Sequence, residues 1–226
     1  MGKEMSEKPL SSSQRALRDL RDKIFSGELA AGSDHLESEL ADLLDMSRTP
    51  VREAVLTLES QGLLELRPRK GVRILPLSPE DMSDVYDVLT ELESHAAERA
   101  AHSGYGDAEL VDLAGAIDDM DAALASRDLD AWAQADDRFH RELVRLGGNS
   151  RICAIVDMMS DQVRRARMTT LFMRPLPTQS NEDHRAVLEA IRSGDAETAR
   201  KIHRRHRQHA KSILVELLRT HRLRFL

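Results

Sequence analysis

The sequence predicts a mainly α protein, made of a small N-terminal domain and an all-α antiparallel helical bundle. The 226 residues are 41% hydrophobic and 32% charged but only 3% aromatic, and they include few Gly and Pro residues (11 and 7). Such a composition favours helices over sheets. Signals for a β-hairpin occur only around residues 63–74, whereas the chain beyond residue 78 has helical periodicity.

The N-terminal domain is expected to span residues 12–75, after a polar and mobile arm at residues 1–11. Apolar residues recur at helical spacing in the segments 15–27, 37–46 and 48–62, and a glycine ends the first and the third. The second and third segments follow each other almost without a connection, as the helices of a helix-turn-helix do.

The same spacing indicates which residues face the core of this domain. In the second helical segment we expect Leu40, Leu43 and Leu44 to face inward. Two short strands at 63–66 and 72–74 follow the third segment and are joined by a turn. Three helices and a hairpin together predict a winged helix-turn-helix.

A proline-containing linker at residues 76–80, PLSPE, separates this domain from the second one at residues 81–222. The breaks between the helical segments of the second domain are short, which predicts that neighbouring helices pack antiparallel in one bundle. The expected helices lie at about 79–102, 107–126, 128–147, 150–171, 180–193 and 195–222.

The stretch SRTPVR begins the second helix of the helix-turn-helix, at the end that enters the major groove of DNA. Ser47 is expected to cap this helix, and Pro50 suits its first turn. Arg48 can bind a guanine edge, Thr49 can contact a phosphate or a thymine methyl group, and Arg52 lies one turn further on the same face. Taken alone, the stretch also fits an ordinary solvent-exposed, capped helix.

The wing supplies a second basic surface, which favours the DNA-binding interpretation. In its turn, RPRKG, the cations of Arg69 and Lys70 can reach the DNA backbone, and Gly71 allows a close approach. The whole chain has a formal net charge of −6, but overall charge governs mainly non-specific affinity, and a local basic patch suits specific binding. The basic residues of this patch are Arg48, Arg52, Arg67, Arg69, Lys70 and Arg73.

Several histidines of the helical bundle lie on apolar helix faces. Asp136 and His140 are four residues apart, and they share one stripe with Trp132. His184 and His206 lie on the apolar stripes of two further helices. Three inward histidines and one inward carboxylate in one bundle need a physical reason to be buried.

A divalent metal ion provides such a reason, because imidazole nitrogen and carboxylate oxygen are ligands of zinc and of other transition metals. We expect zinc first, with nickel and manganese as alternatives. The predicted ligands are Asp136, His140, His184 and His206. The alternative is a set of separate core histidines, each satisfied by its own neighbours.

The stretch LESELADLLDMSRTPVREAVLTLESQGLLELRPRKGVRI resembles the DNA-binding domain of GntR-family bacterial transcription regulators. The shared pattern includes the Leu-Ala of the second helix, SRTPVREA, the Gly-Leu-Leu turn and the glycine of the wing. The resemblance implies DNA contacts by Ser47, Arg48, Thr49, Arg52 and Gly71. Ser38 departs from the pattern, because relatives often have an arginine there that also reads DNA.

The second domain resembles the C-terminal effector domain of the FadR subfamily of GntR regulators, through the motifs DDRFHREL, GGN, EDHRAVLEAI and GDAETARKIHRRHRQH. In metal-binding members of that subfamily, one Asp and three His hold a metal at the floor of a cavity. The motifs map these ligands onto Asp136, His140, His184 and His206. His203 and His209 are expected at the surface, although His203 is an alternative to His206. Six helices rather than seven suggest the smaller, VanR-like variant.

Leu89 is a second departure from the family pattern. Relatives commonly have an arginine at this position, and its side chain is directed at the cavity. If that arginine normally meets an acidic effector, its absence leaves the class of effector open. Arg164, Arg165 and Arg167 could compensate, although we expect several of them to face solvent.

Together these features predict a ligand-responsive transcription regulator, by family habit a repressor, that binds palindromic operator DNA as a homodimer. A small organic acid bound at the metal site is the expected effector. The single cysteine, and the lack of a membrane-length apolar run or a signal peptide, predict a cytoplasmic protein without membrane contact. Two other functions remain open: a metal-dependent enzyme acting on small organic acids, and a nucleoid-type DNA binder without an effector.

Overall fold

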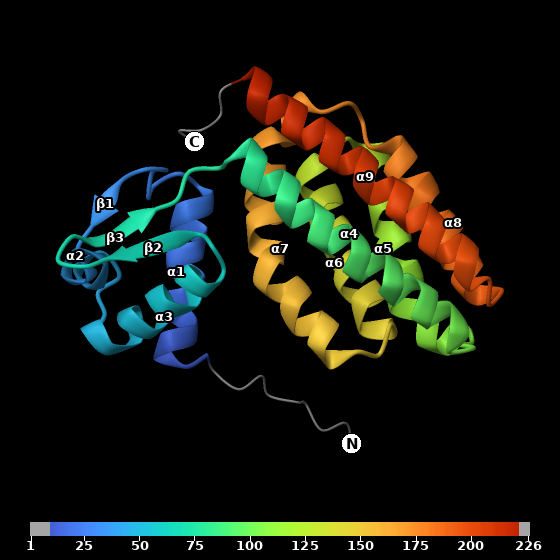
Figure 1. Ribbon diagram of the computed structural model, residues 1–226, viewed down its shortest axis with the longest axis horizontal. Coiled ribbons are helices and arrows are strands. Elements are labelled where there is room, and N and C mark those ends of the chain that lie inside the picture. The colour runs from blue at the N-terminus through green and yellow to red at the C-terminus, as the bar shows by residue number, and fades with distance from the viewer. Residues whose placement is uncertain (1–9, 222–226) are drawn as a thin grey trace. The chain divides into compact units, whose positions relative to one another are not determined.

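The computed structural model describes residues 10–221, and the chain divides after Pro76 into two compact units (Figure 1). The predicted linker at 76–80 includes this division, although Pro79 already begins a helix. Most of the arm predicted at residues 1–11 lies outside the described residues.

The first unit contains the three predicted helices and the hairpin, and one further strand. Its elements are α1 (Ser12–Phe25), β1 (Asp34–His35), α2 (Glu37–Leu43), α3 (Arg48–Ser60), β2 (Leu64–Arg67) and β3 (Gly71–Ile74). The strands are antiparallel, in the order β1-β3-β2. At the start of α1, Ser11 and Gln14 exchange hydrogen bonds in a capping box, which explains why the helix begins there.

Apolar side chains of all three helices and of β2 and β3 form the core of this unit. Val51 and Val55 of α3 are fully buried within it. The prediction for Leu43 is wrong, because its side chain is 45% exposed. The seven-residue helix α2 buries only Leu40 and Ala41, so Leu43 falls on its outer face.

Strand β1 has only two residues, too few for an alternating pattern to show in the sequence. It pairs with β3 next to Gly71, which has a φ of +85°, in the region that favours glycine. A Cβ atom at Gly71 would lie 2.2 Å from the carbonyl oxygen of His35. The packing of β1 therefore requires the glycine of the wing, independently of any contact with DNA.

The second unit is an all-α bundle. Its six helices within the described residues agree with the six predicted segments to within two residues at each end. They are α4 (Pro79–His102), α5 (Asp107–Ser126), α6 (Leu129–Leu146), α7 (Ser150–Thr170), α8 (Thr178–Arg192) and α9 (Ala196–Thr220), with a short 3-10 turn, η1 (Leu171–Met173), after α7. Helices α4 and α9 lie side by side and antiparallel (Figure 1). Among residues 10–221, no helix is both long and apolar enough to span a membrane.

Side-chain caps begin several helices of the bundle. Ser78 accepts a hydrogen bond from the backbone N–H of Asp81 at the start of α4. Asp128, Asn149 and Asp195 do the same for α6, α7 and α9. These local signals explain why the boundaries of the helices could be predicted closely.

Candidate functional site

Helix α3 presents the predicted DNA contacts on its exposed face. Ser47, Arg48, Thr49 and Arg52 are all exposed. The residues of α3 that are buried in the core are Pro50, Val51, Ala54, Val55 and Leu58, whereas Leu56 is 48% exposed. Ser47 stands at the N-cap position, but its side chain makes no capping hydrogen bond, in contrast to the prediction. Its hydroxyl therefore does not compete with a phosphate for the first N–H groups of the helix.

The wing presents Arg69 and Lys70 at its exposed tip, in the turn between β2 and β3. Three other members of the predicted basic patch have acidic contacts within the domain. Arg52 Nη1 of α3 lies 3.7 Å from Glu37 Oε2. Arg67 and Arg73 both contact Asp34, with nitrogen–oxygen distances of 3.1 and 3.4 Å. The exposed cations that remain on the wing are therefore Arg69 and Lys70. Their contact with DNA stays a prediction.

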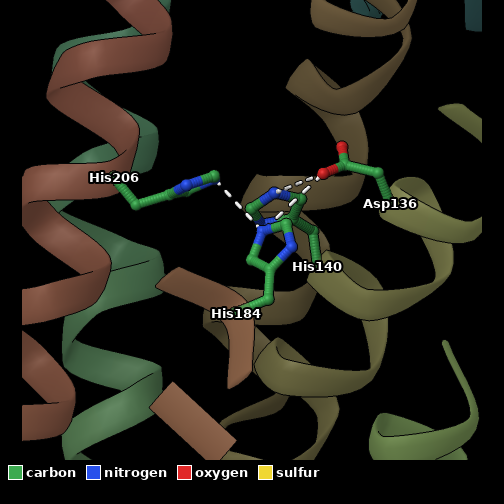
Figure 2. A group of neighbouring side chains, drawn as sticks. All are labelled: Asp136, His140, His184 and His206. Carbon is green, nitrogen blue, oxygen red and sulfur yellow. Dashed lines mark hydrogen bonds and ion pairs between the residues drawn. The ribbon is translucent and has the colours of Figure 1, made fainter. Parts of the chain in front are cut away.

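In the second unit, four buried side chains from three helices meet at one point (Figure 2). Helix α6 supplies Asp136 and His140, α8 supplies His184, and α9 supplies His206. One possible ligand atom of each residue lies within 4.8 Å of those of the other three. We call these four residues the metal quartet; they are the four ligands that the sequence predicts.

The spacing of the ligand atoms is close to that required around one metal ion. The Nε2 atoms of His184 and His206 are 3.2 Å apart. Asp136 Oδ1 lies 3.8 Å from His140 Nε2 and 3.7 Å from His184 Nε2. Tetrahedral ligands at the zinc distances of about 2.0–2.2 Å are separated by about 3.3–3.6 Å. Three imidazoles and one carboxylate therefore fit a zinc-like ion in chemistry and in size.

Neighbouring side chains orient two members of the quartet. His140 Nδ1 lies 2.9 Å from Glu93 Oε2. Because an ionised carboxylate only accepts hydrogen bonds, His140 donates from Nδ1 and keeps the Nε2 lone pair for a metal. Arg167 donates to Asp136 Oδ2 and to the adjacent Asp137, which leaves Asp136 Oδ1 facing the histidines.

Glu93 of α4 joins the metal quartet to a second buried group. Its Oε2 also accepts from His203 Nε2 at 3.0 Å, and its Oε1 lies 3.3 Å from Arg207 Nη2. The prediction that His203 lies at the surface is wrong, because its side chain is fully buried against Glu93. His206, rather than His203, completes the quartet, and His209 is exposed as predicted.

Burial and nearby charge shift the pKa values of Asp136, His184 and His206. Burial lowers the pKa of His184 well below its usual value and also lowers the pKa of His206. Burial alone would raise the pKa of Asp136, but the Arg167 guanidinium and neighbouring cations bring it below its ordinary value. At neutral pH Asp136 is thus ionised, and His184 and His206 are uncharged, which are the forms that bind a metal.

Glu93 and Arg207 were missed by the sequence reasoning, although a signal for Glu93 exists. Glu93 lies on the same buried stripe of α4 as Tyr86, Leu89 and Ala97. A carboxylate on an apolar stripe is the same kind of signal that identified the aspartate of the quartet. For Arg207, which is also buried, helical spacing alone gives no partner.

Leu89 is fully buried among apolar neighbours, at the position where the family resemblance led us to look for an arginine. The three arginines considered as replacements differ in exposure. Arg165 and Arg167 are buried, whereas the side chain of Arg164 is 43% exposed. Of these, Arg167 directly contacts the metal quartet.

Two family models match the chain, in the order of its two units. Residues 12–74 match the model described as "Bacterial regulatory proteins, gntR family", and residues 84–209 match the FCD domain. The chain belongs to the GntR family. Its FCD domain contains the whole metal quartet, together with Glu93 and its partners.

Relatives of this GntR-family chain are transcription regulators. A probable D-xylose utilization operon transcriptional repressor of Paenarthrobacter nicotinovorans is 32% identical over 181 residues, which cover 78% of this chain and 77% of the relative. A gluconate operon transcriptional repressor of Bacillus licheniformis is 28% identical over 186 residues, 81% of this chain and 75% of the relative. The solved structure of Escherichia coli McbR/YncC shares the fold, with a TM-score of 0.77 at 20% identity, over 92% of this chain and 99% of that one.

The family decides between the regulator and the enzyme that the sequence left open. Proteins of the GntR family are DNA-binding transcription regulators, and the matched relatives are regulators rather than enzymes. The chain is therefore a transcription regulator that binds operator DNA, and the interpretation as a metal-dependent enzyme is set aside.

Proposed function

We propose that this regulator is a repressor that binds a near-palindromic operator as a homodimer and is controlled by a small organic acid at a metal site in its FCD domain. The metal quartet carries the proposal, because three imidazoles and one carboxylate from three helices converge with ligand-atom spacings close to those of a tetrahedral zinc site. The two relatives that are named as repressors support repression. Binding to chromosomal DNA would place the protein in the cytoplasm.

The helices that the site joins suggest how it controls DNA binding. The quartet connects α6, α8 and α9, and Glu93 adds α4, the helix that follows the connection to the DNA-binding unit. A divalent ion bound there would supply the positive charge that attracts an acid. His140 and His203 hold Glu93 from α6 and α9, so a displacement of either helix reaches α4 through buried, charged hydrogen bonds.

In a two-fold dimer, such a displacement would change the spacing of the two recognition helices. That spacing must match the two half-sites of an operator, about one helical turn of DNA apart or a multiple of it. The effector acts only if it binds the two arrangements of the dimer with different affinities. We expect an effective acid to weaken operator binding.

Native mass spectrometry of the full chain tests the metal and the dimer together. The wild type should appear as a dimer with one divalent ion per subunit, and His184→Ala should remain a dimer but lose the ion. The exposed His102 on α4 provides the matched control, since His102→Ala should keep the metal. A monomeric wild type, or a His184→Ala variant that keeps its metal, would contradict the proposal.

DNA binding is tested on duplexes selected by the protein from a random library. We expect the selected sequences to share a near-palindrome, and fluorescence anisotropy should show much tighter binding to them than to random DNA. Equal affinity for selected and random duplexes would instead support a nucleoid-type binder and contradict an operator-specific repressor.

A further inference from the structure

A pocket lies beside the metal quartet, lined by residues of α6, η1, α8, α9 and the segment between η1 and α8. Its volume is about 310 Å³, at the lower end of the range for small-molecule sites. His206, the quartet member on α9, forms part of its wall, and so does Arg174, which directly follows η1. A ligand in this pocket can therefore contact Arg174 and the edge of the quartet at once.

Arg174 brings a positive charge to the pocket, and no carboxylate within residues 10–221 lies close enough to form an ion pair with it. Its Nε donates to Thr170 Oγ1 at 2.9 Å, but its buried Nη2 has no hydrogen-bond partner within residues 10–221. Burial lowers the pKa of Arg174, and the nearby Tyr86 and Asp136 only partly offset this effect. Because an unsatisfied buried donor is costly, an anion at this wall would be bound favourably.

Most of the remaining wall is apolar, and none of the residues that line the pocket is acidic. The apolar lining includes Leu129, Trp132, Leu171, Leu176, Ala210 and Ile213. Such a surface favours a ligand with an apolar body, through the area that it removes from water. A polyhydroxylated acid would instead have to bury hydroxyl groups against carbon atoms, which costs free energy for each unpaired group.

We propose that the effector is a monocarboxylate with a compact apolar body, and that Arg174 binds its carboxylate at the edge of the metal quartet. This inference rests on the proposed function, in that the FCD domain binds an organic acid. It adds the binding residue, the pocket and the chemical class of the ligand.

Isothermal titration of the metal-loaded full chain with phenylacetate tests the proposal. Two contrasting probes are compared with it. Phenylacetamide has the same shape without the charge, and gluconate has the charge on a polyhydroxylated body. We expect phenylacetate to bind at least about tenfold more tightly than either, since a hydrogen bond to a charged group and a buried apolar ring are each worth that much. Absent or equal binding of phenylacetate would overturn the assignment of the ligand class.

Variants then test the role of Arg174. Arg174→Gln should weaken phenylacetate binding by about tenfold or more, while metal content and melting temperature show that the site stays assembled. Arg185→Gln, at an exposed arginine of α8 that pairs with Asp121, is the matched control and should bind like the wild type. If Arg174→Gln binds phenylacetate as well as Arg185→Gln does, the role assigned to Arg174 is refuted.

Leu176→Asp provides a second variant at a side chain that is 57% exposed and lines the pocket. Its new carboxylate should repel phenylacetate and reduce the affinity, with little effect on folding. Wild-type affinity in this variant would mean that the ligand binds elsewhere.

Operator binding separates this proposal from the preceding one. If phenylacetate binds through Arg174 but leaves operator affinity unchanged, the pocket is confirmed and control by this ligand fails. If gluconate alone releases the operator, control by an acid stands and the pocket assignment fails.

Discussion

Replacing Glu93 by Gln should destabilise the helical bundle and weaken the metal binding that we propose for it. Glu93 is 2% exposed and Arg207 is 4% exposed, and their oxygen–nitrogen distance is 3.3 Å. The positive charge of Arg207, with His140, brings the pKa of Glu93 well below its usual value, although burial opposes this. The carboxylate is therefore ionised, and its loss leaves a buried guanidinium without its counter-ion.

The expected magnitude follows from this geometry. At 3.3 Å and an effective dielectric constant of about 20, the attraction between the charges is about 5 kcal/mol. Removing the carboxylate also removes its desolvation cost, and Gln can still accept hydrogen bonds from His140 and His203. We therefore expect the free energy of unfolding to fall by about 3 kcal/mol, at the lower end for a broken buried pair. Because Glu93 orients His140, zinc affinity should fall by roughly 10- to 100-fold.

Urea unfolding of the metal-free protein and competition with a zinc chelator measure these two effects. Glu91→Gln is the matched control, since Glu91 is on the same helix but half-exposed and pairs with Arg204 at the surface. We expect this control to change stability by less than about 1 kcal/mol. Equal behaviour of Glu93→Gln and Glu91→Gln in both assays would refute the reasoning, because it would mean that the buried carboxylate neither balances Arg207 nor orients the metal ligand.

Three further predictions concern other parts of the molecule. If Arg52 reads a base, Arg52→Ala should lose about 1–3 kcal/mol of binding free energy on the selected operator and much less on random DNA. Arg69→Ala should weaken binding to both equally and reduce the salt dependence by about one ion. Anisotropy titrations at several salt concentrations measure this, and the opposite pattern for the two variants would contradict the prediction. Burial lowers the pKa of His203 to about 4 from an ordinary 6.5. The unfolded chain therefore takes up this proton first. The contribution of His203 to the free energy of unfolding of the metal-free protein should be fully present above pH 6.5 and decrease by up to about 3 kcal/mol as the pH approaches 4. Urea unfolding at several pH values measures this, and a fall that is unchanged in His203→Gln would exclude His203 as its source. Gly71→Ala should destabilise the first unit by at least about 2 kcal/mol, because its Cβ would meet the His35 carbonyl oxygen in a positive-φ backbone; wild-type thermal unfolding of this variant would contradict that close contact.

Much of the architecture could be predicted because its signals are local. The six helices of the bundle follow from periodicity and from caps such as Ser78 and Asp128, which involve residues within one or two turns. The recognition helix was predictable for the same reason, since its buried and exposed residues alternate with the helical period. The metal quartet could be proposed from three separate stripes, because only one side of each helix can face the core of a bundle.

Helical periodicity in the sequence predicts most of the buried helix faces, although it misplaced Leu43 and His203. The tertiary structure decided how these faces meet: His203 packs against Glu93, His206 completes the quartet, and Arg174 lines a pocket at its edge. It also decided that the two-residue strand β1 adds to the wing. The physical reason is that helical periodicity fixes an angle around one axis, whereas a partner on another helix depends on the crossing and relative height of two axes. Those quantities are set by the packing of the whole core, and no segment of the sequence contains them.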